Sequence, residues 1–341
     1  MSNTTQIIFS LMFTVFVLVG CGTTKDERLL LPSLFTQLSQ DKPLELTLEM
    51  EADWQHLIDN KLSEMVLPVT VSWQEAGNLQ QVKAEVSTRG HARRNICTFP
   101  PLRLRFTEEN LDALELNSDY KSLKLVTHCI NVDEDLVLRE YLAYKMLNIL
   151  TDHSLRVQLA KINYKCSKST IQSYAFLIEN NEEMAERLGG VLMEADLNGQ
   201  ATLDATQYRL MAVFQYMIGN TDWSITKQHN IKLVHFVEQK MLLPVPYDFD
   251  YSGMVNAAYA IPSPKLPIKS VRERYFQWRG KDAAELQATL ALFQEKKQAL
   301  YDLVMGFELL AMESRLDIMN YLDAFYANMP QKSGMVSEVG Q

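Results

Sequence analysis

The sequence has few of the features that mark several common classes of protein. Its 341 residues include only four cysteines, with no Cys-x-x-Cys pair and no cysteine–histidine spacing typical of a zinc site. Lysine and arginine, 33 residues against 42 acidic ones, leave a formal net charge of −9. They form no basic block, so a nucleic-acid-binding surface is not expected. The composition, 47% apolar and 22% charged, is that of an ordinary folded protein with one large domain or two lobes.

The sequence also lacks an apolar run long enough to cross a bilayer comfortably. The run at residues 7–19 (IIFSLMFTVFVLV) is shorter than the roughly 20 residues of a transmembrane helix and fits the apolar region of a signal peptide better. Residues 18–21 (LVGC) resemble a bacterial lipobox, although no lysine or arginine precedes the run. We therefore expect a lipoprotein signal peptide over residues 1–21, with Cys21 lipidated and Gly22 favouring the outer membrane. The alternative is a cytosolic protein with an apolar start.

If Cys21 carries a lipid, three cysteines remain in an oxidising compartment, and the odd number leaves one thiol unpaired. Cys97 and Cys129 flank the same predicted sheet, so a disulfide between them is preferred; pairings with Cys166 stay open. The chain would then be attached to the membrane through its lipid anchor only, facing the periplasm in the cell envelope.

Residues 44–180 are predicted to form a β-rich part, after a tether over residues 22–43. Apolar residues alternate first over residues 44–50 (LELTLEM), as in a half-buried strand. Turn residues around Gly77 join two further alternating runs into a hairpin. The other predicted strands cover residues 69–73, 82–86, 102–106, 123–126, 155–164 and 172–179, and a helix is expected over residues 136–150.

Residues 181–328 are predicted to be mainly helical, and residues 329–341 to be a disordered tail. A proline-rich stretch at residues 261–268 (IPSPKLPI) is expected to be a surface loop, because proline fixes the backbone and removes amide donors. Apolar residues at helical spacing predict helices over residues 181–188, 203–218, 282–307 and 308–325.

Residues 219–253 carry the candidate site. A polar loop with Asp222 leads into a predicted β-hairpin, which ends at residues 248–250 (DFD). Because antiparallel strands place the start of one beside the end of the other, Asn230 is expected to lie close to Asp248. Carboxylates and a carboxamide are the oxygen-rich set that magnesium–nucleotide chemistry requires.

Protein kinases place such groups in the same order: a catalytic Asp, a metal-binding Asn, a hairpin and the Asp of Asp-Phe-Gly. Here the gap from Asp222 to Asn230 is longer, and Asp250 stands where kinases have glycine. Further matching residues, spread over most of the chain, are Arg89-Gly90, 100–106 (PPLRLRF), 124–126 (KLV), 139–144 (REYLAY), 174–179 (YAFLIE), 220–223 (NTDW) and 247–250 (YDFD). On these residues the chain resembles the spore-coat-protein-H-like (CotH) atypical kinases, and more closely a bacterial lipoprotein-like branch of that family.

The resemblance implies an α+β, protein-kinase-like fold of two lobes, with an antiparallel β N-lobe before residue 181 and a mainly helical C-lobe after it. It implies transfer of phosphate from ATP, with Mg²⁺ or Mn²⁺, to a protein or other hydroxyl acceptor in the cell envelope. Asp222 would be the catalytic residue that orients or deprotonates the hydroxyl. Asn230 and Asp248 would hold the metal, and Asp250 could bind a second ion.

The same resemblance implies nucleotide-binding roles for residues of the β-rich part. Arg89 and Gly90 would lie near the phosphates; the alternative is a solvated basic loop. Arg105 matches the phosphate-binding lysine of kinases by position, although the fork of arginine differs from a point-charged ammonium, and Lys124 could supply the cation instead. Glu140 would pair with that cation; the alternative is a surface glutamate.

Other interpretations stay open. Asp222 and Asp250 could be turn residues, because loops are rich in Asp for backbone reasons. The alternative function is a catalytically inactive pseudokinase, a binding or scaffold lipoprotein, which the missing lysine and the scarcity of ATP outside the cytoplasm favour. A glycan- or metal-binding lipoprotein is a third, in which Tyr251 and Tyr259 would matter. His229 is interpreted as a packing or hydrogen-bonding neighbour rather than a general base.

Overall fold

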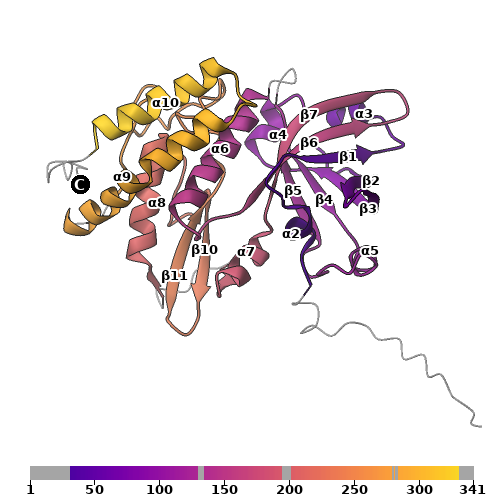
Figure 1. The fold of residues 1–341 in the computed structure, drawn as a ribbon, viewed down its shortest axis with the longest axis horizontal. Coiled ribbons are helices and arrows are strands. Elements are labelled where there is room, and N and C mark those ends of the chain that lie inside the picture. The colour runs from indigo at the N-terminus through magenta and orange to yellow at the C-terminus, as the bar shows by residue number, and fades with distance from the viewer. Residues whose placement is uncertain (1–30, 130–133, 194–200, 279, 281–282, 330–341) are drawn as a thin grey trace, which may run out of the picture.

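A computed structural model describes residues 31–129, 134–193, 201–278, 280 and 283–329. It contains a closed β-barrel and, beside it, a mainly helical part with a small sheet of its own (Figure 1). The predicted signal peptide with Cys21 lies outside the described residues, as does the predicted tail beyond Met329. Within the described ranges, no helix is both long enough and apolar enough to span a membrane.

Seven strands form the barrel, in the order β1-β2-β3-β4-β5-β7-β6. In β1, Leu44, Leu46 and Leu48 are buried inside the barrel while Glu45 and Glu49 are exposed. This is the two-residue period read from the sequence. The strands are β1 (Leu44–Glu49), β2 (Val66–Glu75), β3 (Asn78–Thr88), β4 (Leu102–Arg105), β5 (Ser122–Val126), β6 (Val157–Lys165) and β7 (Thr170–Ile178).

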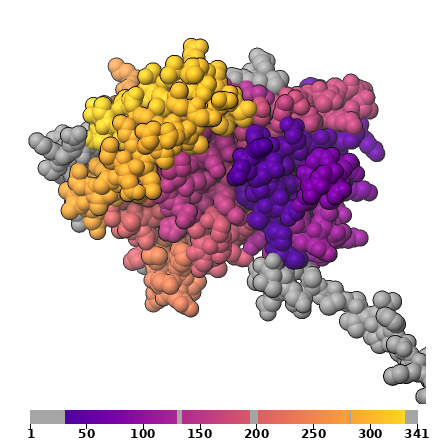
Figure 2. All heavy atoms as spheres, viewed as in Figure 1, coloured from indigo at the N-terminus to yellow at the C-terminus, as the bar shows by residue number. Residues whose placement is uncertain are grey.

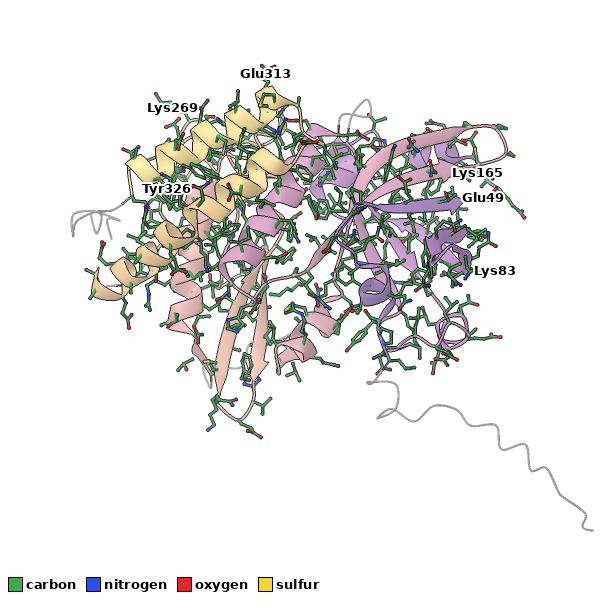
Figure 3. The ribbon with its side chains drawn as sticks, viewed as in Figure 1. Glu49, Lys83, Lys165, Lys269, Glu313 and Tyr326 are labelled. Atoms are coloured by element: carbon green, nitrogen blue, oxygen red, sulfur yellow. A yellow bond between two sulfur atoms is a disulfide. The ribbon has the colours of Figure 1, made fainter. Side chains whose placement is uncertain are left out.

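The expectation of a protein-kinase-like fold of two lobes is wrong, because the β-rich part closes into a barrel. β1 pairs antiparallel with β2 and parallel with β6, so neither edge of the sheet is left free. The parallel register places Glu49 opposite Lys165, and these side chains form a 2.9 Å ion pair at this junction (Figure 3). Periodicity identifies strands one at a time and does not say which edges meet, so closure was not predicted.

The second part is built on α6 (Asp135–Leu150), α8 (Ala205–Ile218), α9 (Ala283–Gly306) and α10 (Met312–Ala327). These helices share one hydrophobic core. α6 packs against β6 and β7 and also against α9, although the sequence places it among the predicted strands. α9 and α10 form one continuous surface of the molecule (Figure 2).

The helical part also contains a four-stranded sheet in the order β8-β10-β11-β9. Its strands are β8 (Val191–Leu192), β9 (Thr202–Leu203), β10 (Ile231–Phe236) and β11 (Met241–Pro246). β10 and β11 are antiparallel, and Ile231 pairs with Pro246. The hairpin predicted from the sequence is therefore present.

Part of the predicted tether is folded onto the body. α2 (Leu34–Leu38) buries Leu34 and Phe35, and the hydroxyl of Ser33 donates a 2.7 Å hydrogen bond to Glu183. The other short helices are α3 (Trp54–Asp59), α4 (Ala92–Ile96), α5 (Glu108–Asp112) and α7 (Asn181–Arg187).

α8 ends at Gly219, and this glycine fixes where the site loop begins. Its φ of 68° is the left-handed conformation that glycine adopts at little cost at a helix end. A Cβ at this position would lie 1.9 Å from the Tyr321 hydroxyl. The Gly219 carbonyl accepts a hydrogen bond from the Gly253 amide at 3.1 Å. The loop after α8 and the loop after β11 are thereby held side by side.

Candidate active site

A pocket of about 460 Å³ lies between the barrel and the helical part. Its charged and polar lining residues come from three segments far apart in the sequence: the turn after β3, the loop between α8 and β10, and the loop after β11. Carboxylates and guanidinium groups both line the pocket, so it presents negative and positive charge together. The lining residues are Arg89, Gly90, His91, Ala92, Arg93, Pro101, Val126, Asp222, His229, Asn230, Asp248, Asp250 and Tyr251.

Asp222 lies in a loop whose backbone is tied on both sides. The Asn220 side-chain oxygen accepts a 3.0 Å hydrogen bond from the Asp222 amide. Ser224 and His229 exchange two backbone hydrogen bonds of 3.0 Å, so the loop turns back on itself. Asn230 has a φ of 53°, in the left-handed region that asparagine tolerates better than most residues. The turn places residues 229 and 230 beside Asp222.

Both oxygens of the Asp222 carboxylate are bonded by that turn. His229 Nε2 lies 2.9 Å from Oδ1, and Asn230 Nδ2 lies 3.1 Å from Oδ2 and 2.7 Å from the Asp222 carbonyl oxygen. Because the nitrogen of the Asn230 amide is used in these bonds, its Oδ1 is the atom that can bind a cation. The Asp222 side chain is 40% exposed, so a hydroxyl can approach it.

Asp248 and Asp250 are fixed by the phenylalanine between them. Phe249 is buried, with its ring 4.6 Å from that of Tyr144 and 5.4 Å from that of Phe214. The Tyr144 hydroxyl accepts a 2.9 Å hydrogen bond from the Asp248 amide. Asp248 has a φ of 64°, so the chain turns sharply there. Both carboxylates therefore line the pocket while Phe249 packs in the core.

The environment of Asp250 opposes its negative charge. Burial, together with the nearby carboxylate of Asp248, raises the pKa of Asp250 to about 7. The Tyr259 hydroxyl donates a 2.9 Å hydrogen bond to Asp250 Oδ2. A divalent cation between the two carboxylates would remove their repulsion.

The turn after β3 contributes Arg89 and Gly90. Gly90 has a φ of 83° with open space around it, and the Arg89 amide donates a 2.8 Å hydrogen bond to the Pro101 carbonyl. Burial lowers the pKa of Arg89, and Asp248 opposes that effect. Since a guanidinium still keeps its proton, Arg89 brings a positive charge to the acidic loop.

Arg93 is the cation that pairs with Glu140, in place of Arg105 or Lys124. Its Nη1 lies 2.8 Å from Glu140 Oε2, and the side chains are 8% and 1% exposed. Nη2 donates a 3.1 Å hydrogen bond to the Thr127 carbonyl. Burial raises the pKa of Glu140 to about 8 although Arg93 opposes this. Burial alone would lower the pKa of Arg93, but Glu140 and the other nearby groups raise it.

The structure does not bring Arg105 to the pocket. Side chains alternate along β4, and Arg105 is exposed at its end, opposite Ser122 of β5. Lys124 is partly buried on β5 and is not among the lining residues. Burial, with a contribution from Arg89, lowers the pKa of Lys124 to about 7. Lys124 therefore does not line the pocket, and its surroundings disfavour its positive charge.

The importance of Arg93 was missed in the sequence, where it is one of several arginines after Gly90. The feature of the sequence that could have identified Arg93 was Cys97, one helical turn further on, because a disulfide there would fix the position of this helix. Cys97 and Cys129, the pair preferred from the sequence, form a disulfide, and Cys166 is a free buried cysteine. The Cys97 amide donates a 2.8 Å hydrogen bond to the Arg93 carbonyl. The disulfide therefore holds α4 against the end of β5 and places Arg93 beside the core.

The acidic residues fit a magnesium ion that has few protein ligands. Among the described residues, no group of three or more His, Cys, Asp or Glu side chains is arranged to hold a metal. Asp248 and Asp250, however, line the same pocket as the carboxamide of Asn230. Mg²⁺ commonly takes one or two carboxylates and completes its shell with phosphate oxygens and water. Two carboxylates and one carboxamide are therefore the oxygen donors that the described part of this pocket offers to such an ion.

Comparison with known proteins adds no assignment: no protein-family model matches the chain, and no curated protein matches it in sequence. The resemblance to the CotH kinases stays a prediction from the residues that carry it.

Proposed function

We propose that the protein transfers a phosphoryl group from magnesium-bound ATP to a hydroxyl acceptor, on a protein or another molecule of the cell envelope. The observation that carries the proposal is the presence in one pocket of Asp222, Asn230, Asp248 and Asp250 together with two arginines. Phosphoryl transfer depends on positioning and on stabilising charge, which these groups supply. The resemblance to the CotH kinases implies the same chemistry, and that chemistry depends on the site rather than on a kinase-like fold.

Asp222 would orient the attacking hydroxyl and accept its proton. Its carboxylate is fixed by two donors, and the remaining lone pairs can accept a hydrogen bond from the acceptor. In the transfer, the hydroxyl oxygen bonds to the γ-phosphorus and the bond from that phosphorus to the β–γ bridging oxygen breaks. ADP leaves, and the hydroxyl proton passes to Asp222.

Asn230, Asp248 and Asp250 would hold the magnesium ion, which when bound neutralises charge on the phosphates. Arg93 supports an anion beside them. Its Nη1 and Nη2 are bonded within the protein, whereas its buried Nε has no hydrogen-bond partner in the described part of the chain. An unpaired buried donor is costly, and an anion that reached this nitrogen would satisfy it.

Thermal unfolding with and without magnesium–ATP tests the binding step. ATP at about 100 times its Kd should stabilise the folded protein by roughly 2.7 kcal/mol. Asp248→Ala should lose this stabilisation, while Asp112→Ala, an exposed control on α5, should keep it. Transfer of radiolabel to a generic protein acceptor should be abolished in Asp222→Asn. A wild type that neither binds ATP nor transfers phosphate would refute the proposal.

A nucleotide-binding scaffold without transfer activity is the second candidate. One observation favours it: among the described residues that line the pocket, the cations are Arg89 and Arg93, with no lysine. Arginine binds phosphate through a planar fork rather than as a point charge. Stabilisation by magnesium–ATP without any transfer would decide for this candidate.

A further inference from the structure

His229 takes part in no bond that forms or breaks in the chemistry proposed above, yet its imidazole contacts the carboxylate that this chemistry uses. Nε2 is 2.9 Å from Asp222 Oδ1, and the side chain is 53% exposed. In the described part of the chain, this is its one side-chain hydrogen bond. The imidazole is therefore directed at Asp222 rather than packed into a core.

The backbone conformation of the loop places His229 beside Asp222. The paired hydrogen bonds between Ser224 and His229 close a short turn. Inside it, the Lys227 amide donates to the Ser224 hydroxyl at 3.3 Å, and Gln228 has a φ of 48°. A strained residue within a turn costs free energy and persists only where the surroundings impose it. The turn thus fixes the backbone of His229 beside Asp222.

We infer that His229 is a positioning residue that holds the Asp222 carboxylate in the orientation required for phosphoryl transfer. The inference rests on the proposed function. His229 bonds Oδ1 and Asn230 bonds Oδ2, so the carboxylate cannot rotate without breaking one of the two bonds. Small displacements of a catalytic group can lower a rate by about 100-fold, because the reacting atoms must be aligned.

Because His229 and Asp222 are both exposed, a role of His229 in positioning can be distinguished from a role in folding. An ion pair or hydrogen bond between two such exposed side chains contributes little to the stability of a protein. Removal of the imidazole should therefore leave the melting temperature and the affinity for magnesium–ATP unchanged. It should lower kcat, because Asn230 alone would restrain only one carboxylate oxygen.

The test compares His229→Ala, His229→Gln and the control His56→Ala, which removes an exposed histidine of α3 in the barrel part. Radiolabel transfer from magnesium–ATP to casein gives kcat and KM. His229→Ala should lower kcat about 10- to 100-fold with little change in KM, as expected when a supporting hydrogen bond to a functional group is lost. His229→Gln, which keeps an N–H donor, should recover most of the rate, and added imidazole should partly restore His229→Ala.

The outcomes separate this inference from the proposed function. If the wild type transfers phosphate, Asp222→Asn is inactive and His229→Ala has the wild-type kcat, the inference fails and the proposed function stands. A fall in melting temperature or ATP affinity that accounts for the whole loss of activity also overturns it, because His229 would then act on folding or binding. If the wild type transfers no phosphate, the proposed function fails first and the inference falls with it.

Discussion

The buried ion pair between Arg93 and Glu140 offers the sharpest test of how this pocket is held together. The side chains are 8% and 1% exposed and 2.8 Å apart. Breaking a buried pair costs about 3–5 kcal/mol because the remaining charge has no partner, whereas replacing both members by apolar residues is often neutral or stabilising. Arg93→Met, Glu140→Leu and the double variant should therefore show a large favourable coupling free energy.

The two single variants should differ in a predictable way. In Glu140→Leu the guanidinium of Arg93 cannot lose its proton, so the loss should reach about 3–5 kcal/mol. In Arg93→Met the carboxyl of Glu140 can take up a proton, since burial raises its pKa and the opposing charge of Arg93 is gone. The cost of Arg93→Met should therefore be smaller at pH 7 and should grow as the pH rises and deprotonation of Glu140 becomes favourable.

Urea unfolding of the four proteins measures these free energies, with a constant m-value as the check that each unfolds in one step. The double variant should be less destabilised than Glu140→Leu. It should also lose stabilisation by magnesium–ATP, since the guanidinium is gone from the pocket. Single variants that each cost less than about 1 kcal/mol, or a double variant whose cost equals their sum, would refute the assignment of a buried, coupled pair.

Three further predictions concern the scaffold. Gly219→Ala should destabilise the protein by more than about 1 kcal/mol, since the φ of Gly219 is positive and an added Cβ would meet a tyrosine hydroxyl at 1.9 Å. The control is Gly306→Ala, at a position with open space around it. Equal unfolding free energies for the two variants would contradict this prediction. Burial lowers the pKa of His128 to about 4, so the unfolded state takes up the proton first, and about 3 kcal/mol of stability present above pH 6.5 should be lost as the pH falls to 4. His128→Phe should lack this part of the pH dependence in urea unfolding, and parallel curves for the two proteins would count against it. Replacing Cys97 and Cys129 by alanine should cost about 3–4 kcal/mol for a loop of 32 residues and weaken ATP binding, whereas unchanged binding would show that the disulfide does not place the pocket arginine.

Several features of the site follow from local sequence. The hairpin of β10 and β11 was predicted, because alternation of apolar residues acts over a few neighbouring positions. That hairpin alone places Asn230 near Asp248, since antiparallel strands bring their opposite ends together. Two αL residues of the site loops, Asn230 and Asp248, are of types that occupy such turns readily.

Only the tertiary structure decided the closure of the barrel and the choice of Arg93 as the partner of Glu140. Both depend on which distant segments meet. The parallel pairing of β1 with β6 does not change the two-residue apolar period of either strand, so the sequence of each strand does not reveal it. Arg105 matched the expected cation by position, yet the alternation of β4 places it on the exposed side. Local sequence thus determines strands, turns and candidate ligands, because these depend on short-range sterics and burial. Which strands pair and which side chains form ion pairs depend on packing between distant segments, which local sequence patterns do not reveal.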